Sequence, residues 1–106
     1  MLFELRRYVC MPGRRDDWVR VMEEVVIPFQ SSKGMVILGS WVSEEDDTSY
    51  LWLRRFQDEA ERKRHYAAVY ESDEWKNELR PQFAGMLNSE ARQVTRLIPT
   101  PKSPIR

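Results

Sequence analysis

The first strand-like segment of the chain, residues 2–10, has two faces of different chemistry, because successive side chains of a β-strand point to opposite sides. One face is apolar, with Phe3, Leu5 and Val9. The other carries an acid, a base and a phenol, namely Glu4, Arg6 and Tyr8. We expect the apolar face to pack beneath helices. The polar face must then meet water, a partner subunit or a ligand, because burying unpaired polar groups is costly.

Three more strand-like segments follow, over residues 35–42, 48–56 and 91–98. The pair Gly39-Ser40 indicates a β-bulge in the first of them. On strand 48–56, one face carries Tyr50, Trp52 and Arg54.

Two helical regions alternate with these strands. Apolar residues spaced three and four apart predict a helix over 14–30, in which Pro28 bends or ends the last turn. Asp58, followed three residues later by Glu61, is a capping-box-like start for a helix that continues to Tyr70. This second helix is highly charged, so we expect most of it to be solvated. A further helical segment is predicted over 74–79.

The element order βαββαβ is that of the ferredoxin-like unit. We therefore predict an α+β fold with one antiparallel four-stranded sheet. The length of 106 residues suits a single domain, 1–106. Residues 99–106 are rich in proline and are expected to form an extended tail outside the sheet.

The helices can cover only one face of such a sheet. The uncovered face would carry a large aromatic load, from Tyr8, Tyr50, Trp52 and also Trp41, which is unusual for an exposed surface. A second copy facing it would bury these side chains. We therefore predict a homodimeric α+β barrel. Its cavities would be lined by Glu4, Arg6, Tyr8, Trp52 and Arg54.

The overall charge argues against several classes of partner. Basic and acidic residues number 17 each, so binding to nucleic acid or membranes driven by net charge is not expected. No apolar run approaches the roughly 20 residues of a membrane-spanning helix. Cys10 is the only cysteine, which excludes an intrachain disulfide and fits a reducing compartment. We expect a cytoplasmic protein.

Metal and cofactor sites are not indicated. His65 is the only histidine, so a conventional zinc site would depend on carboxylates and Cys10. There is no glycine-rich phosphate loop. We therefore predict neither a metal nor a cofactor. His65 lies in a run of charged helix residues and is expected to be solvated rather than catalytic.

Several blocks of the sequence, taken in order, resemble the NIPSNAP family. They are Phe3–Tyr8, Met11–Arg14 with Trp18, Leu51-Trp52, Asp58–Arg62, Ser72–Trp75 and Arg96–Pro104. The resemblance covers essentially the whole chain and implies the dimeric α+β barrel fold. Without the targeting extension of the eukaryotic members, the chain resembles a bacterial single-domain member. The wider fold group includes cofactor-independent monooxygenases, isomerases and ligand-sensing domains.

Three functions remain open from the sequence. The first is binding of a small metabolite, with Arg6 pairing a carboxylate or enolate and Tyr8 donating a hydrogen bond. The second is a cofactor-independent monooxygenase or isomerase acting on a small aromatic or acidic substrate, in which Tyr8 or Glu4 moves the proton. The third is an interaction protein with a filled barrel. A structural alternative for the polar trio is a Glu4–Arg6 ion pair at the dimer interface. Trp52 and Arg54 could form an aromatic wall and an anion clamp, or could simply pack.

Overall fold

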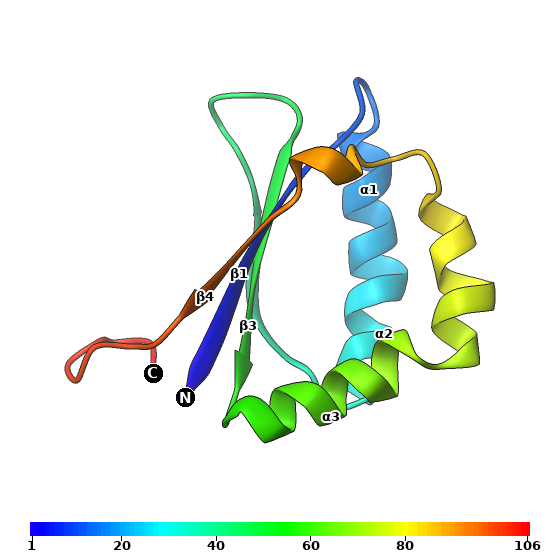
Figure 1. The fold of residues 1–106 in the computed structure, drawn as a ribbon. Coiled ribbons are helices and arrows are strands. Elements are labelled where there is room, and N and C mark those ends of the chain that lie inside the picture. Colours follow the sequence, from blue (N-terminus) through cyan, green and yellow to red (C-terminus); the bar gives the residue numbers. More distant parts are fainter.

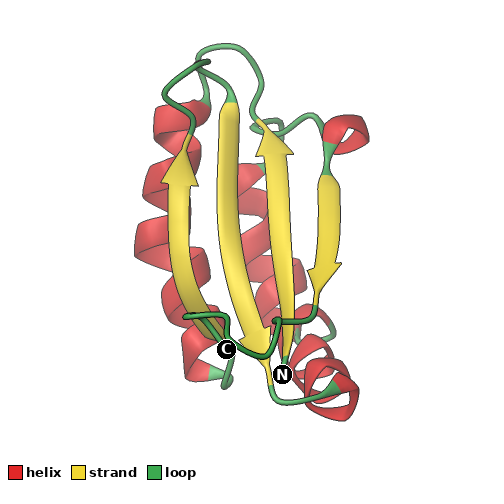
Figure 2. Cartoon of the chain, turned by 90° about the vertical axis from the view of Figure 1, so that its left-hand side faces the viewer, coloured by secondary structure: helices red, strands yellow, loops and turns green.

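Four antiparallel strands form one sheet in the computed structural model, which describes residues 1–106. The strands are β1 (Leu2–Val9), β2 (Val36–Val42), β3 (Ser49–Phe56) and β4 (Gln93–Leu97), each within its predicted range. Their order in space is β2-β3-β1-β4 (Figure 2). The predicted α+β, ferredoxin-like fold is confirmed. The predicted bulge is also present, as a register shift between Ile37 and Gly39.

The helices lie together on one face of the sheet (Figure 1). α1 (Arg15–Val21) runs through a π-helical turn (Met22–Val26) into α2 (Ile27–Ser32) without a break. Pro28 therefore does not end this helix, contrary to one of the two predicted effects. The backbone N–H of Ile27 bonds to the carbonyl of Met22, five residues back. Such a widened turn relieves the clash between a proline ring and the carbonyl four residues before it.

The second helical region begins as predicted. In α3 (Glu59–Tyr70), the Asp58 side chain caps the helix by accepting a hydrogen bond from the Glu61 N–H at 2.8 Å. A π-helical turn (Trp75–Leu79) and a 3-10 turn (Arg80–Phe83) follow. A last 3-10 turn (Ser89–Ala91) leads into β4. None of these helices has the length and apolar character to cross a membrane.

The two faces of β1 are the reverse of the prediction. Glu4, Arg6 and Tyr8 point toward the helices, and they are only 2%, 8% and 8% exposed. Leu5 and Val9 lie half-buried on the other face, which no helix covers. Phe3 is on that face too but is only 4% exposed, and it lines a pocket with Ile98 and residues of the tail. The expectation that the apolar face packs inside fails here. The Tyr66 hydroxyl in the helical layer hydrogen-bonds to both Glu4 and Arg6, which offsets part of the cost of burying these polar side chains.

The neighbouring strands follow the same orientation. Tyr50, Trp52 and Arg54 of β3 are buried beneath the helices. Trp41 of β2 was predicted on the uncovered face together with these aromatics, and it alone lies there, paired with Leu51 and 51% exposed. The Trp41 ring packs against Gly39. A Cβ atom added at Gly39 would lie 2.7 Å from the ring.

The open face of the sheet is largely apolar. Val36, Trp41 and Leu97 remain 37%, 51% and 40% exposed on it. The tail, residues 99–106, leaves the end of β4 on this side of the sheet (Figures 1 and 2). It lies outside the sheet as predicted but is not fully extended, because the Ser103 N–H bonds back to the Thr100 carbonyl at 3.0 Å.

Candidate functional site

A cavity of about 100 Å³ lies between the sheet and the helical layer. The sheet contributes Arg6, Tyr8 and Trp52 to its lining. The remaining lining residues are mostly apolar or aromatic, namely Trp18, Met22, Val26, Gln30, Tyr70, Trp75, Phe83, Leu87 and Arg92. Three of the five predicted site residues thus meet in one cavity. The cavity lies within a single subunit rather than between two sheets, because the polar face of β1 turns inward.

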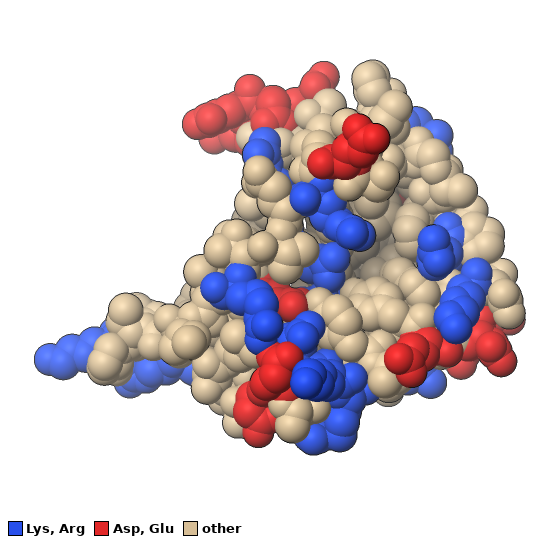
Figure 3. Space-filling view, viewed as in Figure 1, with Lys and Arg blue, Asp and Glu red and all other residues tan.

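A second, wider cavity of about 760 Å³ continues from the first toward solvent. The two share Tyr70, Trp75, Phe83, Leu87 and Arg92. The outer cavity adds Lys76, Arg80, Pro81, Ala84, Gly85 and Ser89. Figure 3 shows a hollow between the sheet and the helices with basic side chains around it. Every charged residue that lines either cavity is basic.

Arg6 is the charged group that the chain itself leaves unpaired inside the protein. Its Nη1 donates a hydrogen bond to the Tyr66 hydroxyl at 3.1 Å. No carboxylate lies within 4.0 Å of its guanidinium, and its Nε is buried without a hydrogen-bond partner. A buried cation without a counter-charge is costly, so this position favours an anionic partner from outside the chain.

Tyr8 and Trp52 form a polar pair on the cavity wall. The Trp52 indole N–H donates to the Tyr8 hydroxyl at 3.2 Å. Burial raises the pKa of Tyr8 above its usual value. Tyr8 therefore keeps its proton at neutral pH. This favours Tyr8 as a hydrogen-bond donor to a ligand over Tyr8 as a proton acceptor.

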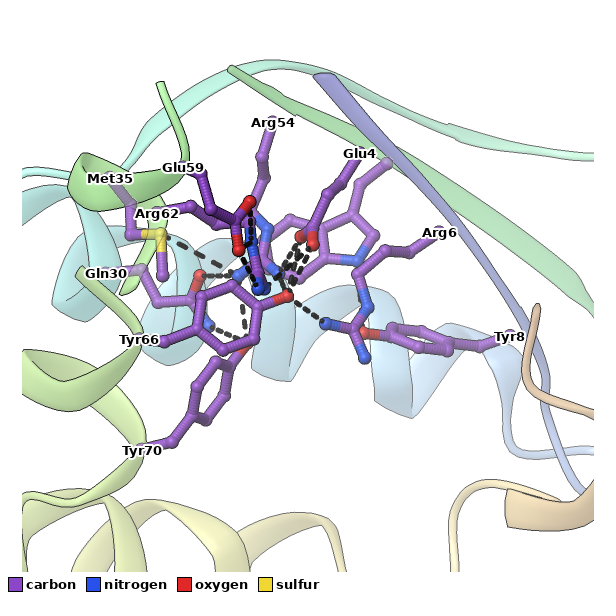
Figure 4. Close-up of polar contacts among 11 residues, drawn as sticks. Glu4, Arg6, Tyr8, Gln30, Met35, Arg54, Glu59, Arg62, Tyr66 and Tyr70 are labelled. Carbon is purple, nitrogen blue, oxygen red and sulfur yellow. Dashed lines mark hydrogen bonds and ion pairs between the residues drawn. The ribbon is translucent and has the colours of Figure 1, made fainter. Parts of the chain in front are cut away.

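Glu4 and Arg54, the other two predicted site residues, do not line the cavity but form a buried ion pair beside it (Figure 4). Arg54 Nη2 lies 2.8 Å from Glu4 Oε1, and the two side chains are 0% and 2% exposed. The predicted Glu4–Arg6 pair does not form. Arg54 stands directly opposite Glu4 on the neighbouring strand, and cross-strand neighbours on one face are closely spaced.

A network of tyrosines and an amide surrounds this ion pair. The Tyr66 hydroxyl donates to the Glu4 carboxylate, 2.6 and 2.8 Å from its two oxygens. Arg54 Nη1 donates to Tyr70 at 2.8 Å and to Gln30 at 2.9 Å. Figure 4 shows these side chains converging from the sheet and from the helices.

The surroundings of Arg54 and Tyr66 raise the pKa of both side chains. Desolvation alone would lower the pKa of Arg54, but Tyr70, Tyr66 and Glu4 raise it above its usual value. Burial raises the pKa of Tyr66 to about 12. Neither Arg54 nor Tyr66 changes its charge near neutral pH, so their hydrogen bonds join sheet to helix beside the cavity.

Tyr66 and Tyr70 were not predicted as site residues, because they lie on a helix that was expected to be mostly solvated. Their four-residue spacing puts both on one face of α3 and could have identified them as inward-facing. Arg92 was also missed, because only the fold brings it to both cavities. Trp18 and Trp75 pack in the hydrophobic core and also line the inner cavity.

His65 lies away from both cavities. It is half-buried rather than solvated, and its Nε2 is 2.8 Å from where a Cβ at Gly34 would lie. Nothing places it near Arg6 or Tyr8. No group of three or more histidine, cysteine or carboxylate side chains is arranged to hold a metal ion.

A comparison with known proteins shows which family the chain belongs to. Residues 3–104 match the NIPSNAP family model. The chain belongs to the NIPSNAP family. The resemblance seen in the sequence is therefore confirmed. None of the curated proteins matches the chain.

Solved structures of bacterial NIPSNAP proteins have the same fold. A NIPSNAP family protein of unknown function from Agrobacterium tumefaciens aligns with a TM-score of 0.89 at 20% identity, over 100% of this chain and 94% of that one. A NIPSNAP domain protein from Burkholderia xenovorans gives 0.86 at 17% identity, over 98% and 99%. An antibiotic biosynthesis monooxygenase gives 0.67 at 16% identity, over 95% and 100%. At these identities the likeness establishes the fold alone.

Proposed function

We propose that this NIPSNAP protein binds a small organic anion in the cavity between its sheet and its helices. The observation that carries the proposal is Arg6. It is a buried guanidinium without a carboxylate partner, and it lines a cavity whose other walls are mostly aromatic and apolar. A ligand carboxylate would supply the missing negative charge.

The cavity wall offers complementary groups for such a ligand. The Arg6 guanidinium can donate to a ligand carboxylate, because within the chain its side chain makes a single hydrogen bond, from Nη1 to the Tyr66 hydroxyl. Tyr8 can add a hydrogen bond from its protonated hydroxyl. Trp18, Trp52 and Trp75 provide aromatic surface for an apolar body.

The geometry supports binding more than the enzymatic alternative. Glu4 is engaged by Arg54 and Tyr66 and does not line the cavity, so it is poorly placed to take a proton from a ligand. Tyr8 lines the cavity but has a raised pKa. The cavity lies within one subunit, beneath its helices, so it does not bear on whether the space between two facing sheets is filled.

We also propose that two copies associate through the open faces of their sheets. The apolar residues exposed there would be buried by a second copy, which is the arrangement expected of a dimeric α+β barrel. In this assembly the barrel interior would hold the open faces of the two sheets, including Trp41. Each ligand cavity would lie outside that interior, beneath the helices of its own subunit.

Isothermal titration calorimetry with two ligands of matched shape tests the binding proposal. 4-Methylbenzoate is expected to bind, and the neutral 4-methylbenzamide is expected to bind at least tenfold more weakly, because it lacks the charge that Arg6 requires. Arg6→Met should abolish this preference for the acid. Arg64→Met removes the same charge from an exposed position on α3 and should leave the preference unchanged. Equal binding of acid and amide by the unaltered protein would contradict the proposal.

A further inference from the structure

The inner cavity is too small to hold a whole ligand. Its volume of about 100 Å³ corresponds to roughly three water molecules, at about 30 Å³ each. Ligand sites in proteins usually occupy roughly 300–1,000 Å³. An anionic group with a few attached atoms would fill the space beside Arg6, so the rest of the ligand has to extend into the outer cavity of about 760 Å³.

The passage between the two cavities is lined by mainly aromatic side chains. Tyr70, Trp75, Phe83 and Leu87 belong to both linings, and so does Arg92. Trp75 and Phe83 lie next to each other, with ring centroids 5.7 Å apart. The part of a ligand that crosses this passage is therefore expected to be apolar.

The outer cavity is basic and has no acidic counterpart. Lys76, Arg80 and Arg92 line it, and none of the three forms an ion pair with a carboxylate of the chain. No aspartate or glutamate lines either cavity. The charged side chains that line the two cavities, from the outer opening to Arg6, are thus all positive, which favours negative charge at both ends of a bound molecule.

We propose that the ligand of this site is an elongated dianion, with one anionic group at Arg6, an apolar middle in the passage and a second anionic group near Lys76 and Arg80. This inference rests on the proposed function, because it extends the same site outward. It adds a substrate class that the inner cavity alone does not specify, in which both ends of the molecule carry negative charge.

Calorimetric titration with straight-chain acids of equal length tests this proposal. Hexanedioate, octanedioate and decanedioate are compared with hexanoate, octanoate and decanoate in 20 mM and 300 mM salt. We expect at least one diacid to bind roughly fivefold to tenfold more tightly than its monoacid, the gain expected from a few exposed charge contacts. High salt should reduce this advantage, because the outer basic residues are exposed.

Two double variants locate the second anionic group. Lys76→Gln with Arg80→Gln should remove the advantage of the diacid and leave monoacid binding unchanged. Lys63→Gln with Arg64→Gln changes the charge equally at exposed positions of α3 and should preserve the advantage. An advantage that survives the first pair of substitutions would overturn the assignment of the outer site.

The titrations also separate this inference from the function on which it rests. Monoacids that bind as tightly as diacids at every length would overturn the dianion and leave the binding of a single anion intact. If neither series binds and 4-methylbenzoate also fails to bind, the proposed function and the dianion are both wrong.

Discussion

Two arginines on the covered face of the sheet have very different surroundings. Arg54 is completely buried and hydrogen-bonded to Glu4, Gln30, Tyr66 and Tyr70. Arg6 is nearly as buried but has a single neutral partner, the Tyr66 hydroxyl. Residue type and burial alone would not distinguish these two arginines. The difference in partners indicates that Arg54 maintains the fold, whereas Arg6 has no carboxylate partner in the chain and is the residue assigned to the proposed ligand.

Arg54→Met is expected to destabilise the protein by about 3–5 kcal/mol, because it leaves the Glu4 carboxylate buried without its main counter-charge. The free energy of unfolding in urea measures the loss. Adding Glu4→Gln should recover part of it, since the uncompensated charge is then removed. A loss below about 1 kcal/mol, within the range of exposed ion pairs, would show that the pair is not effectively buried.

Arg6→Met should leave the thermal unfolding midpoint of the ligand-free protein unchanged or raise it. Replacing an unpaired buried charge with an apolar side chain of similar size removes a desolvation cost. Residues retained for binding commonly lower stability in this way. A fall in midpoint as large as that of Arg54→Met would assign Arg6 a structural role and contradict its place in the binding site.

At the scale of elements, the first turn of α3 is tied to the edge of the sheet. Glu59 pairs with Arg62 on its own helix and with Arg96 on β4. The hydrogen bond from Arg62, together with the two positive charges, lowers the pKa of Glu59 to about 2. Arg62 also reaches to within 3.6 Å of Glu4, so this surface pair adjoins the buried network.

This depressed pKa predicts a defined acid sensitivity. A carboxylate with a lowered folded-state pKa contributes stability above its unfolded value, here 4.5, and loses it as the pH falls toward about 2. The Glu59→Gln variant should therefore be less stable than the unaltered protein at pH 6, with the difference shrinking as the pH approaches 2. Urea unfolding at a series of pH values measures this difference in the free energy of unfolding. A difference in unfolding free energy between the two proteins that does not change with pH would contradict the lowered pKa of Glu59.

The helices also show which local sequence signals were sufficient to predict secondary structure. The capping residues at Asp58 and the apolar spacing over 14–30 predicted both helical regions well, because caps and spacing act within a few residues. Pro28 was predicted to bend or end the last turn, and the helix instead continues past it to Ser32. This continuation depends on the preceding turn widening to a π-helix, an adjustment that residue types alone do not specify.

At the scale of the whole molecule, the layer of helices leaves one apolar face of the sheet uncovered (Figure 2). Leu5 and Leu53 are paired at the centre of this face, and Trp41 lies toward its edge. A surface of this kind in a small protein of zero net charge favours self-association. The proposed homodimer follows from this surface rather than from the aromatic residues first considered.

Leu53→Glu is expected to convert the proposed dimer to a monomer, because it would place a charge at the centre of the buried interface. The monomer should stay folded, since this position is only half-buried within one subunit. Sedimentation velocity measures the assembly state and circular dichroism the fold. Ala67→Glu, on the exposed side of α3, is the matched control and should remain dimeric. A monomeric unaltered protein would refute the dimer.

The sequence by itself determined the element order, the strand ranges, the helix start at Asp58 and the family. It also identified Arg6, Tyr8 and Trp52 as neighbours on one face of the sheet, because period-two alternation fixes such faces locally. Only the tertiary structure decided which face the helices cover. That choice depends on whether distant side chains such as Tyr66 and Tyr70 satisfy the buried charges of Glu4 and Arg54, and no local pattern contains those contacts.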